Sequence, residues 1–310
     1  MTATTTSIRR PTLIVIVGPT GSGKTSLSIA LAQHYAAPII STDSRQVYRG
    51  MAIGTAQPSS EELAAAEHHF IADREIFDDF NCGRYEQEAL KCLEELFKAH
   101  NIVVAVGGSG LYIQALCDGL DALPEADDTL RAELKHRLET EGIESLVDQL
   151  RELDPKYVAE LDVYNPQRVV RALEVCLVTG RPYSELRSGN VAKRDFDIIK
   201  IGTEMDREVL YDRINRRVDI MLNDGLLKEV EALLPHRHLN SLQTVGYREF
   251  FDYFDGKCSL EESVELVKRN SRRYAKRQMT WFRRDEAIAW FAPDKVEEII
   301  EYINGKILQN

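Results

Sequence analysis

The chain has 310 residues, is 44% hydrophobic and 29% charged, and carries a formal net charge of −11. This composition is typical of a globular protein with a substantial core and excludes a disordered or fibrous chain, and the acidic balance by itself argues against a nucleic-acid partner. The five cysteines are scattered without a C-x-x-C pair, the N-terminus has no apolar leader, and the apolar runs are of strand length. We therefore expect a cytoplasmic protein with reduced thiols, no zinc site and no membrane span.

The first part of the chain alternates strand-length apolar runs with stretches of helical spacing. The run Leu-Ile-Val-Ile-Val at 13–17 has no polar residue, as expected of a strand covered on both faces of a sheet. Strands that alternate with helices predict an α/β fold built on a parallel sheet. We expect strands at 13–17, 38–41 and 102–106, weaker ones at 198–201 and 287–291, and a helix at 26–35.

Between residues 121 and 197 the pattern changes to helices alone. Leu130, Leu134 and Leu138 recur at four-residue steps, and apolar residues up to position 150 continue the helical pattern. We therefore predict an all-helical insertion domain, 121–197, within a core domain formed by 11–120 and 198–310. Further helices are expected at 166–179, 207–222, 226–234 and 260–282.

A glycine-rich stretch, Gly-Pro-Thr-Gly-Ser-Gly-Lys-Thr, follows the first strand. Its spacing matches the P-loop, in which glycines let backbone N–H groups converge on phosphate oxygens. Lys24 adds a positive charge, Thr25 offers a hydroxyl to Mg²⁺, and the N-terminus of the following helix favours an anion. We predict a P-loop NTPase-like sheet flanked by helices, with a phosphate site made by Gly18, Pro19, Thr20, Gly21, Ser22, Gly23, Lys24 and Thr25.

The phosphate loop does not by itself define the reaction. A hydrolytic enzyme of this type places an aspartate after another apolar strand, but the strand at 102–106 is followed by glycines, whereas Asp43 follows the strand at 38–41. Ligands of open α/β sheets lie beyond the carboxyl ends of the strands, so Asp43 should face the loop. It could hold a metal, take a proton from a nucleophile, or cap a turn.

A cationic stretch near the C-terminus departs from the acidic average. Residues 268–284 carry eight basic residues, three aromatics and no acid. On a helix, Arg269, Arg273, Arg277 and Arg284 would share one face. Such a stretch can bind phosphates and stack bases, and a solvated charged face is the alternative interpretation.

Arg213 and Arg217 form a second cationic pair, four residues apart on one face of an expected helix. Two guanidinium groups could clamp a diphosphate bidentately. Surface ion pairing with Asp212, Glu208 or Asp219 is the alternative, and the spacing does not decide between them.

Several segments together resemble the tRNA dimethylallyltransferases, which modify the adenosine beside the anticodon. They follow the order of that family and extend from about residue 13 to residue 291. The segments are GPTGSGKT (18–25), DSRQVYRGMAIGTAQP (43–58), HH (68–69), VGGSGLY (106–112), NPQRVVRALEV (165–175), TGRPYSE (179–185), RINRRVDIMLNDGLLKEV (213–230), QTVGYRE (243–249) and RRYAKRQMTWFRR (272–284). The DSRQVY and AKRQ-x-TWFR segments are far more specific than the P-loop alone.

The resemblance implies a reaction. Members of the family move a dimethylallyl group from dimethylallyl diphosphate to the exocyclic amine of the adenosine on the 3′ side of the anticodon, so the P-loop would hold the diphosphate as a leaving group with Mg²⁺. Thr20 and Asp43 match the family's catalytic positions, and Arg217 matches its diphosphate-contacting arginine. The insertion matches the domain that embraces the anticodon stem-loop. Positions that match tRNA contacts are Asp43, Ser44, Arg45, Gln46, Ser109, Arg131, Gln167, Arg168, Val169, Val170, Arg171, Gln243, Thr244, Val245, Gly246, Tyr247 and Arg248.

Other functions stay open on the residues themselves. They are prenylation of free adenine nucleotides, a small-molecule kinase with Asp43 as base, and a non-catalytic RNA-binding protein with a vestigial P-loop. The tRNA-type segments weigh against the first, the basic aromatic stretch against the second, and the intact Lys24, Thr25 and Asp43 against the third. The loop could also take nucleoside triphosphates. Nothing in the sequence demands an oligomer, so we expect a monomer.

Overall fold

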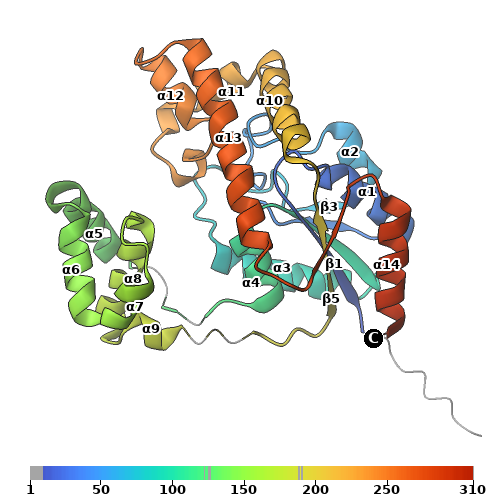
Figure 1. Cartoon of the computed structure of the whole chain (residues 1–310), viewed down its shortest axis with the longest axis horizontal. Helices are drawn as coiled ribbons and strands as arrows, with labels where there is room; N and C mark the ends of the chain where they lie inside the picture. The colour runs from blue at the N-terminus through green and yellow to red at the C-terminus, as the bar shows by residue number, and fades with distance from the viewer. Residues whose placement is uncertain (1–9, 122, 125–126, 188, 190, 310) are drawn as a thin grey trace, which may run out of the picture. The chain divides into compact units, whose positions relative to one another are not determined.

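The computed structural model describes residues 10–121, 123–124, 127–187, 189 and 191–309 (Figure 1). Its contacts divide the chain into two compact units. We call Met1–Cys117 with Lys193–Asn310 the sheet unit and Asp118–Ala192 the helical unit. The helical unit begins and ends a few residues before the insertion domain that the sequence predicts, 121–197. Among the described residues, no helix is both long and apolar enough to cross a membrane.

The sheet unit is built on six strands in the order β3-β2-β4-β1-β5-β6. All neighbouring strands run parallel, which confirms the predicted α/β fold. The five predicted strands are present, and β3 was not predicted because two residues show no periodicity. The strands are β1 (Thr12–Val17), β2 (Ile39–Ser41), β3 (His68–His69), β4 (Ile102–Gly107), β5 (Asp197–Thr203) and β6 (Ile288–Phe291).

The central strand β1 explains why its sequence is apolar without interruption. It pairs with β4 from Thr12↔Ile102 onward and with β5 on its other edge. Leu13 contributes to a core on one face of the sheet and Ile14 to a core on the other, because successive side chains point to opposite faces. The carboxyl ends of β1, β2, β4 and β5 therefore meet at one edge, which is where the glycine-rich loop and Asp43 follow their strands.

Helices cover both faces of this sheet (Figure 1). Apolar residues of α1 and α14 pack in one core, and those of α3 pack in the other. The helices of the sheet unit are α1 (Lys24–Tyr35), α2 (Ser60–Ala65), α3 (Cys82–Leu96), α4 (Gly110–Asp118), α10 (Arg207–Asn223), α11 (Leu226–Leu233), α12 (Arg248–Phe254), α13 (Leu260–Phe282) and α14 (Val296–Gln309), with 3₁₀ turns at Leu234–His236 and Asn240–Leu242.

The long helix α13 has a start and an end that its sequence accounts for. Ser259 and Glu262 form a capping box at its N-terminus, each side chain accepting the other's backbone N–H. The helix ends at Phe282. Arg284 therefore lies beyond the helix, and the expectation that it shares a helix face with Arg273 and Arg277 is wrong.

The described residues of the helical unit form helices only. The apolar pattern up to position 150 is broken into two helices at Gly142, whose φ of 85° is unfavourable for other residues. At the base of the unit, the N–H of Ala192 donates to the carbonyl oxygen of Asp118 at 2.7 Å. The helices are α5 (Asp128–Glu141), α6 (Ile143–Leu153), α7 (Pro155–Glu160), α8 (Pro166–Thr179) and α9 (Tyr183–Leu186).

Candidate functional site

The phosphate loop connects the carboxyl end of β1 to the first turn of α1. Gly18 and Gly23 have φ values of 152° and 88°, and a Cβ on Gly18 would lie 2.2 Å from Oγ1 of Thr203 at the end of β5. Ser22 fixes the loop from inside, because its hydroxyl lies 2.8 Å from the carbonyl oxygen of Pro19 and 2.6 Å from Thr203 Oγ1. The shape of the loop is thus set by its own hydrogen bonds and by the neighbouring strand.

The amine of Lys24 folds back onto this loop. Its Nζ donates to the carbonyl oxygen of Pro19 at 2.6 Å. Burial lowers the pKa of Lys24 from 10.5 to about 7; the Asp43 carboxylate raises this pKa and the Arg217 cation lowers it further. The structure therefore brings these three charged side chains within electrostatic reach of one another. A buried amine that has lost part of its charge regains it beside an anion, as a diphosphate site requires.

Asp43 follows β2 and takes one of the three roles considered for it, that of capping a turn. Its Oδ1 accepts the backbone N–H groups of Arg45 at 2.8 Å and Gln46 at 3.3 Å, so the residue does cap a turn. Within the described part of the chain, no hydrogen bond is recorded for its Oδ2. The half-buried carboxylate therefore has one oxygen committed to the turn and one available to a ligand.

Three hydroxyl groups gather beside Asp43. The backbone N–H of Ser44 donates to Ser109 Oγ at 3.0 Å, and the two serine hydroxyls lie 3.2 Å apart. The phenol of Tyr274, on α13, lies within interaction range of Ser109 and of the Asp43 carboxylate. Burial, and after it the Asp43 carboxylate, raise the pKa of Tyr274 to about 12, so this phenol stays protonated. Of the predicted tRNA-contact positions, Ser44 and Ser109 thus lie together beside Asp43, whereas the side chains of Arg45 and Gln46 donate to the carbonyl oxygens of Asn240 and of residues 55–56.

A second residue of α13 reaches the phosphate loop itself. Gln278 Oε1 accepts the backbone N–H of Thr20 at 2.9 Å, and Gln278 Nε2 donates to the carbonyl oxygen of Gly108 at 2.9 Å. The side chain is almost completely buried. Sequence reasoning missed this residue because a single glutamine within a basic stretch carries no signal of a loop contact.

Helix α10 packs against the other side of the loop. A Cβ on Gly21 would lie 3.2 Å from Ile214 of α10, and Arg217 follows Ile214 by one helical turn. Two aspartates of α10 pair with other cations. Over the described ranges, neither Arg213 nor Arg217 has a carboxylate at ion-pair distance. Surface ion pairing therefore does not explain why Arg217 lies near Lys24.

The predicted tRNA segment that ends at Arg248 is divided between the core and the surface. Tyr247 is fully buried, and its hydroxyl donates to Glu229 at 2.6 Å. The same carboxylate accepts the N–H groups of residues 53–54, each at 2.9 Å. Tyr247 is thus a packing residue whose side chain is out of reach of RNA, while Gln243 and Arg248 are exposed.

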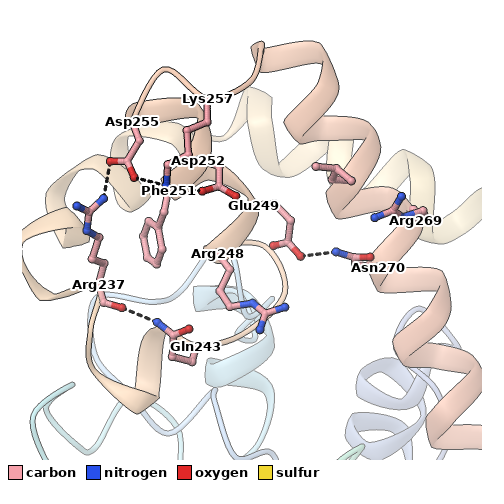
Figure 2. Close-up of a pocket in the computed structure, with 11 residues that line it drawn as sticks. Arg237, Gln243, Arg248, Glu249, Phe251, Asp252, Asp255, Lys257, Arg269 and Asn270 are labelled. Carbon is pink, nitrogen blue, oxygen red and sulfur yellow. Dashed lines mark hydrogen bonds and ion pairs between the residues drawn. The ribbon is translucent and has the colours of Figure 1, made fainter. Parts of the chain in front are cut away.

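A cavity of about 580 Å³ is lined by residues of α12, α13, the loop between them and the segment before α12 (Figure 2). Its cations Arg237 and Lys257 pair with neighbouring aspartates. Its other cations, Arg248 and Arg269, have no ion pair in the part of the chain that the structure describes. None of the residues lining the cavity belongs to the phosphate loop. The cavity is therefore no part of the phosphate site, and its free guanidinium groups suit an anionic polymer.

In the helical unit, two predicted tRNA-contact arginines meet at one buried acid. Glu174 is fully buried and pairs with Arg131 at 2.9 Å and Arg171 at 2.8 Å. It also accepts the backbone N–H of Asp127 at 3.1 Å. Both arginines are about one-third exposed, so each can hold Glu174 and still present part of its guanidinium to a ligand.

The other predicted residues of α8 lie on two faces of the helix. Val169 and Val170 are buried in the core of the helical unit. Gln167 and Arg168 are exposed on the opposite face. Only the exposed pair offers side chains to a nucleic acid, and the two valines hold the helix in place.

Comparisons with known proteins identify the relatives of this chain. The family model described as IPP transferase matches residues 46–285. A tRNA dimethylallyltransferase 1 from Phocaeicola vulgatus is 49% identical over 294 residues, which cover 95% of this chain and 98% of that protein. The tRNA isopentenylpyrophosphate transferase of Bacillus halodurans superposes with a TM-score of 0.73 and 39% identity, covering 97% of this chain and 98% of the other. A eukaryotic dimethylallyltransferase acting on tRNA gives a TM-score of 0.73 at 28% identity, with coverage of 88% and 70%.

Proposed function

This chain belongs to the IPP transferase family, and we propose on that premise that it transfers a dimethylallyl group from dimethylallyl diphosphate to N6 of the adenosine 3′ to the anticodon in tRNA. One observation from the structure carries the proposal. The Lys24 amine, the Asp43 carboxylate and the Arg217 guanidinium converge at a phosphate loop, with the cationic helix α13 bonded to that loop. Anion-binding groups, a carboxylate with a free oxygen and an RNA-binding surface are what this transfer requires.

The reaction divides between these groups as follows. The bond between C1 of the dimethylallyl group and a diphosphate oxygen breaks, and the diphosphate leaves with both electrons. Lys24 and Arg217 offset the charge that develops on it, while Thr20 lies in the loop that holds it. N6 of the adenosine forms the new bond to C1 and gives up a proton, which the free oxygen of Asp43 accepts. Diphosphate is therefore a leaving group here and is not itself split.

The donor groups at the loop fit a magnesium ion. Mg²⁺ keeps most of its waters and takes one or two protein ligands together with substrate phosphates, so a dense carboxylate cluster is not needed. Thr25, whose hydroxyl has no hydrogen bond recorded among the described residues, would hold the ion beside the diphosphate. The ion would supply further neutralisation of the leaving group.

The acceptor RNA would lie along α13 and the pocket of Figure 2. Arg269, Arg273 and Arg277 are exposed on α13, without an ion pair in the described residues. The target adenine must leave its stack to reach Asp43, and Ser44, Ser109 and Tyr274 would surround it there.

The RNA surface is tested by salt dependence. The logarithm of tRNA affinity should fall linearly with the logarithm of salt concentration. Replacing both Arg273 and Arg277 with glutamine should reduce the slope by about two, roughly one for each lost phosphate contact. A response to salt that is flat in the wild type would reject this surface.

We further propose that the protein acts as a monomer in the cytoplasm. The five cysteines are scattered along the chain without a C-x-x-C pair, which suits a reducing compartment. Sedimentation of the purified protein with and without tRNA would test the oligomeric state.

The experiment that tests the function uses labelled dimethylallyl diphosphate with Mg²⁺ and tRNA that lacks the modification. We expect label in tRNA, and none when the target adenosine is replaced by another nucleoside. Free AMP and an ATP-plus-nucleoside mixture serve as parallel acceptors. Label in AMP alone would assign the chain to free nucleotides, and consumption of ATP without prenyl transfer would indicate a kinase.

A further inference from the structure

A single side chain connects α13 to two separate loops of the site. Gln278 Oε1 accepts a hydrogen bond from the N–H of Thr20, and Gln278 Nε2 donates one to the carbonyl oxygen of Gly108, both at 2.9 Å. Thr20 lies in the phosphate loop after β1, and Gly108 lies in the loop after β4. Only 6% of Gln278 is exposed, so water does not replace these partners easily.

The chemistry of this contact fits a carboxamide and little else. The loop at Thr20 presents a donor and the loop at Gly108 presents an acceptor, so the bridging group must accept at one end and donate at the other. A carboxylate only accepts, an ammonium or guanidinium only donates, and an apolar chain does neither. The two partners also fix which end of the Gln278 amide is oxygen and which is nitrogen.

The glycine at position 108 is explained by the same contact. A Cβ there would lie 2.2 Å from Nε2 of Gln278, closer than real Cβ contacts allow. The φ of Gly108 is not in the left-handed region, so the backbone itself would accept alanine. The space that Gly108 leaves open is the space that the Gln278 amide occupies.

The contact also decides how Thr20 takes part in anion binding. Its N–H is used by Gln278 and is turned toward α13, so the remaining N–H groups of the loop and the Lys24 amine are left to the anion. Lys24 is itself bonded to Pro19, the residue next to Thr20. A shift of Thr20 would therefore move the lysine as well as the loop, and misplacement of about 1 Å can cost two orders of magnitude in rate.

We propose that Gln278 is a positioning residue that sets the phosphate loop in the geometry that binds diphosphate, by fixing Thr20 to α13 and to the loop after β4. This inference rests on the proposed function for the identity of the anion. Gln278 does not touch the reacting atoms, and it acts through Thr20 and Lys24.

The test compares four variants with the wild type in the full-length protein. These are Gln278→Ala, Gln278→Glu, Gly108→Ala and the double variant Gly108→Ala/Gln278→Ala. Binding of inorganic diphosphate with Mg²⁺ is measured by calorimetry, and KM is measured separately for dimethylallyl diphosphate and for tRNA. Thr280→Val is the matched control, because within the described ranges the Thr280 hydroxyl bonds only to the Lys276 carbonyl of its own helix.

We expect Gln278→Ala to weaken diphosphate binding about tenfold, the effect of one buried hydrogen bond, and to leave the KM for tRNA unchanged. Gly108→Ala should weaken diphosphate binding similarly, because its methyl group displaces the amide. On the Gln278→Ala background the clash is gone and the next neighbour, the carbonyl oxygen of Gly18, lies at an ordinary 3.5 Å, so the methyl group should add no further loss. Thr280→Val should bind diphosphate as the wild type does.

The glutamate variant separates positioning from general damage to the fold. A neutral carboxyl group has one acceptor and one donor, like the amide, and its ionised form has no donor. Burial raises the pKa of such a carboxyl, so the ratio of Gln278→Glu affinity to wild-type affinity should recover as pH falls from 8 toward 5.5. A general packing defect would give a ratio independent of pH.

The outcomes distinguish this inference from the function on which it rests. Label transferred to tRNA, together with variants that bind diphosphate as tightly as the wild type, would overturn the role of Gln278 and leave the function standing. Weakened diphosphate binding in the variants, with no transfer to tRNA by the wild type, would support the role and overturn the function. An equal increase in the KM for tRNA and in the KM for dimethylallyl diphosphate would mean that Gln278 has a structural role alone.

Discussion

Glu174 in the helical unit and Asp43 in the sheet unit both accept backbone N–H groups, yet they are used in opposite ways. Glu174 is fully buried and is saturated by two guanidinium groups and the N–H of Asp127. Asp43 is half-buried, and among the residues that the structure describes only its Oδ1 accepts hydrogen bonds, from the turn at 45–46. The comparison teaches that partners, more than burial, decide what a carboxylate can do. A saturated acid stabilises a fold, and one with an oxygen to spare can take a proton.

The largest effect is expected at Asp43. Asp43→Asn keeps an oxygen for the N–H groups of Arg45 and Gln46, so the turn should survive, but the negative charge is lost. We expect the turnover number to fall by about 10²–10⁴-fold while tRNA still binds. Single-turnover transfer of label and a tRNA-binding titration measure the two properties. If Asp43→Asn turned over at the wild-type rate, the Asp43 carboxylate would have no part in the chemistry, and the contrast with Glu174 would fail.

At Glu174 the same kind of change should affect stability. Glu174→Ala leaves the Arg131 and Arg171 cations without their buried partner, and breaking such an ion pair costs about 3–5 kcal/mol. Urea unfolding together with hydrogen exchange over 118–192 would measure the loss.

Glu185→Ala is the matched control for Glu174, because Glu185 is exposed and pairs with Arg181 at 3.5 Å. Exposed pairs contribute at most about 1 kcal/mol. If the two variants lost equal stability, Glu174 would not be the centre of the helical unit.

Because of the lowered pKa of Lys24, we expect rising pH to weaken diphosphate binding and to increase the stability of the folded protein. This pKa is lowered from 10.5 to about 7 in the folded protein, so between these values the unfolded chain binds more protons than the folded one. The destabilising contribution of Lys24 is fully present below pH 7 and is relieved as pH rises toward 10.5. Diphosphate needs the charged amine, so its affinity should weaken up to about tenfold for each pH unit above 7.

Calorimetry in buffers of different ionisation enthalpy would detect the proton taken up when diphosphate binds. Lys24→Met lacks the titrating amine and is the control that subtracts the titration of diphosphate itself. Identical pH profiles for wild type and Lys24→Met would contradict an anion site at this amine.

The smallest effect is expected at Glu229, a second saturated carboxylate. It accepts two backbone N–H groups and the Tyr247 hydroxyl, and a glutamine offers only one oxygen in its place. Glu229→Gln should cost about 1–2 kcal/mol of stability with little change in turnover. Tyr247→Phe removes one of the three bonds and should cost less than Glu229→Gln. Thermal unfolding of both variants tests this order.

Much of the fold followed from patterns that repeat along the chain. The uninterrupted apolar run of β1 predicted a strand buried on both faces, and the helices Pro166–Thr179 and Leu260–Phe282 have the predicted bounds. The break at Gly142 and the end of α13 before Arg284 depend on single residues, whose effect periodicity does not measure. Patterns therefore predicted element types better than element ends.

The site was predictable where a residue acts through its own chemistry. Lys24 and Asp43 were found from a motif and from the position of a strand end, and the structure places them in reach of one another. Gln278, Glu229 and Glu174 act by holding backbone groups or cations that are distant in sequence. Their partners are defined only by the folded chain, so no local signal could have identified them.

The hydrogen bond between Ala192 and Asp118 has a practical consequence for protein engineering. It holds the first and last residues of the helical unit next to each other, so the unit is an insertion between two adjacent points of the chain. A linker of a few residues could take its place without stretching the chain, and the same two residues could receive a module from a relative. Exchange of this kind would show which transfer RNAs are chosen by the module and which by its host.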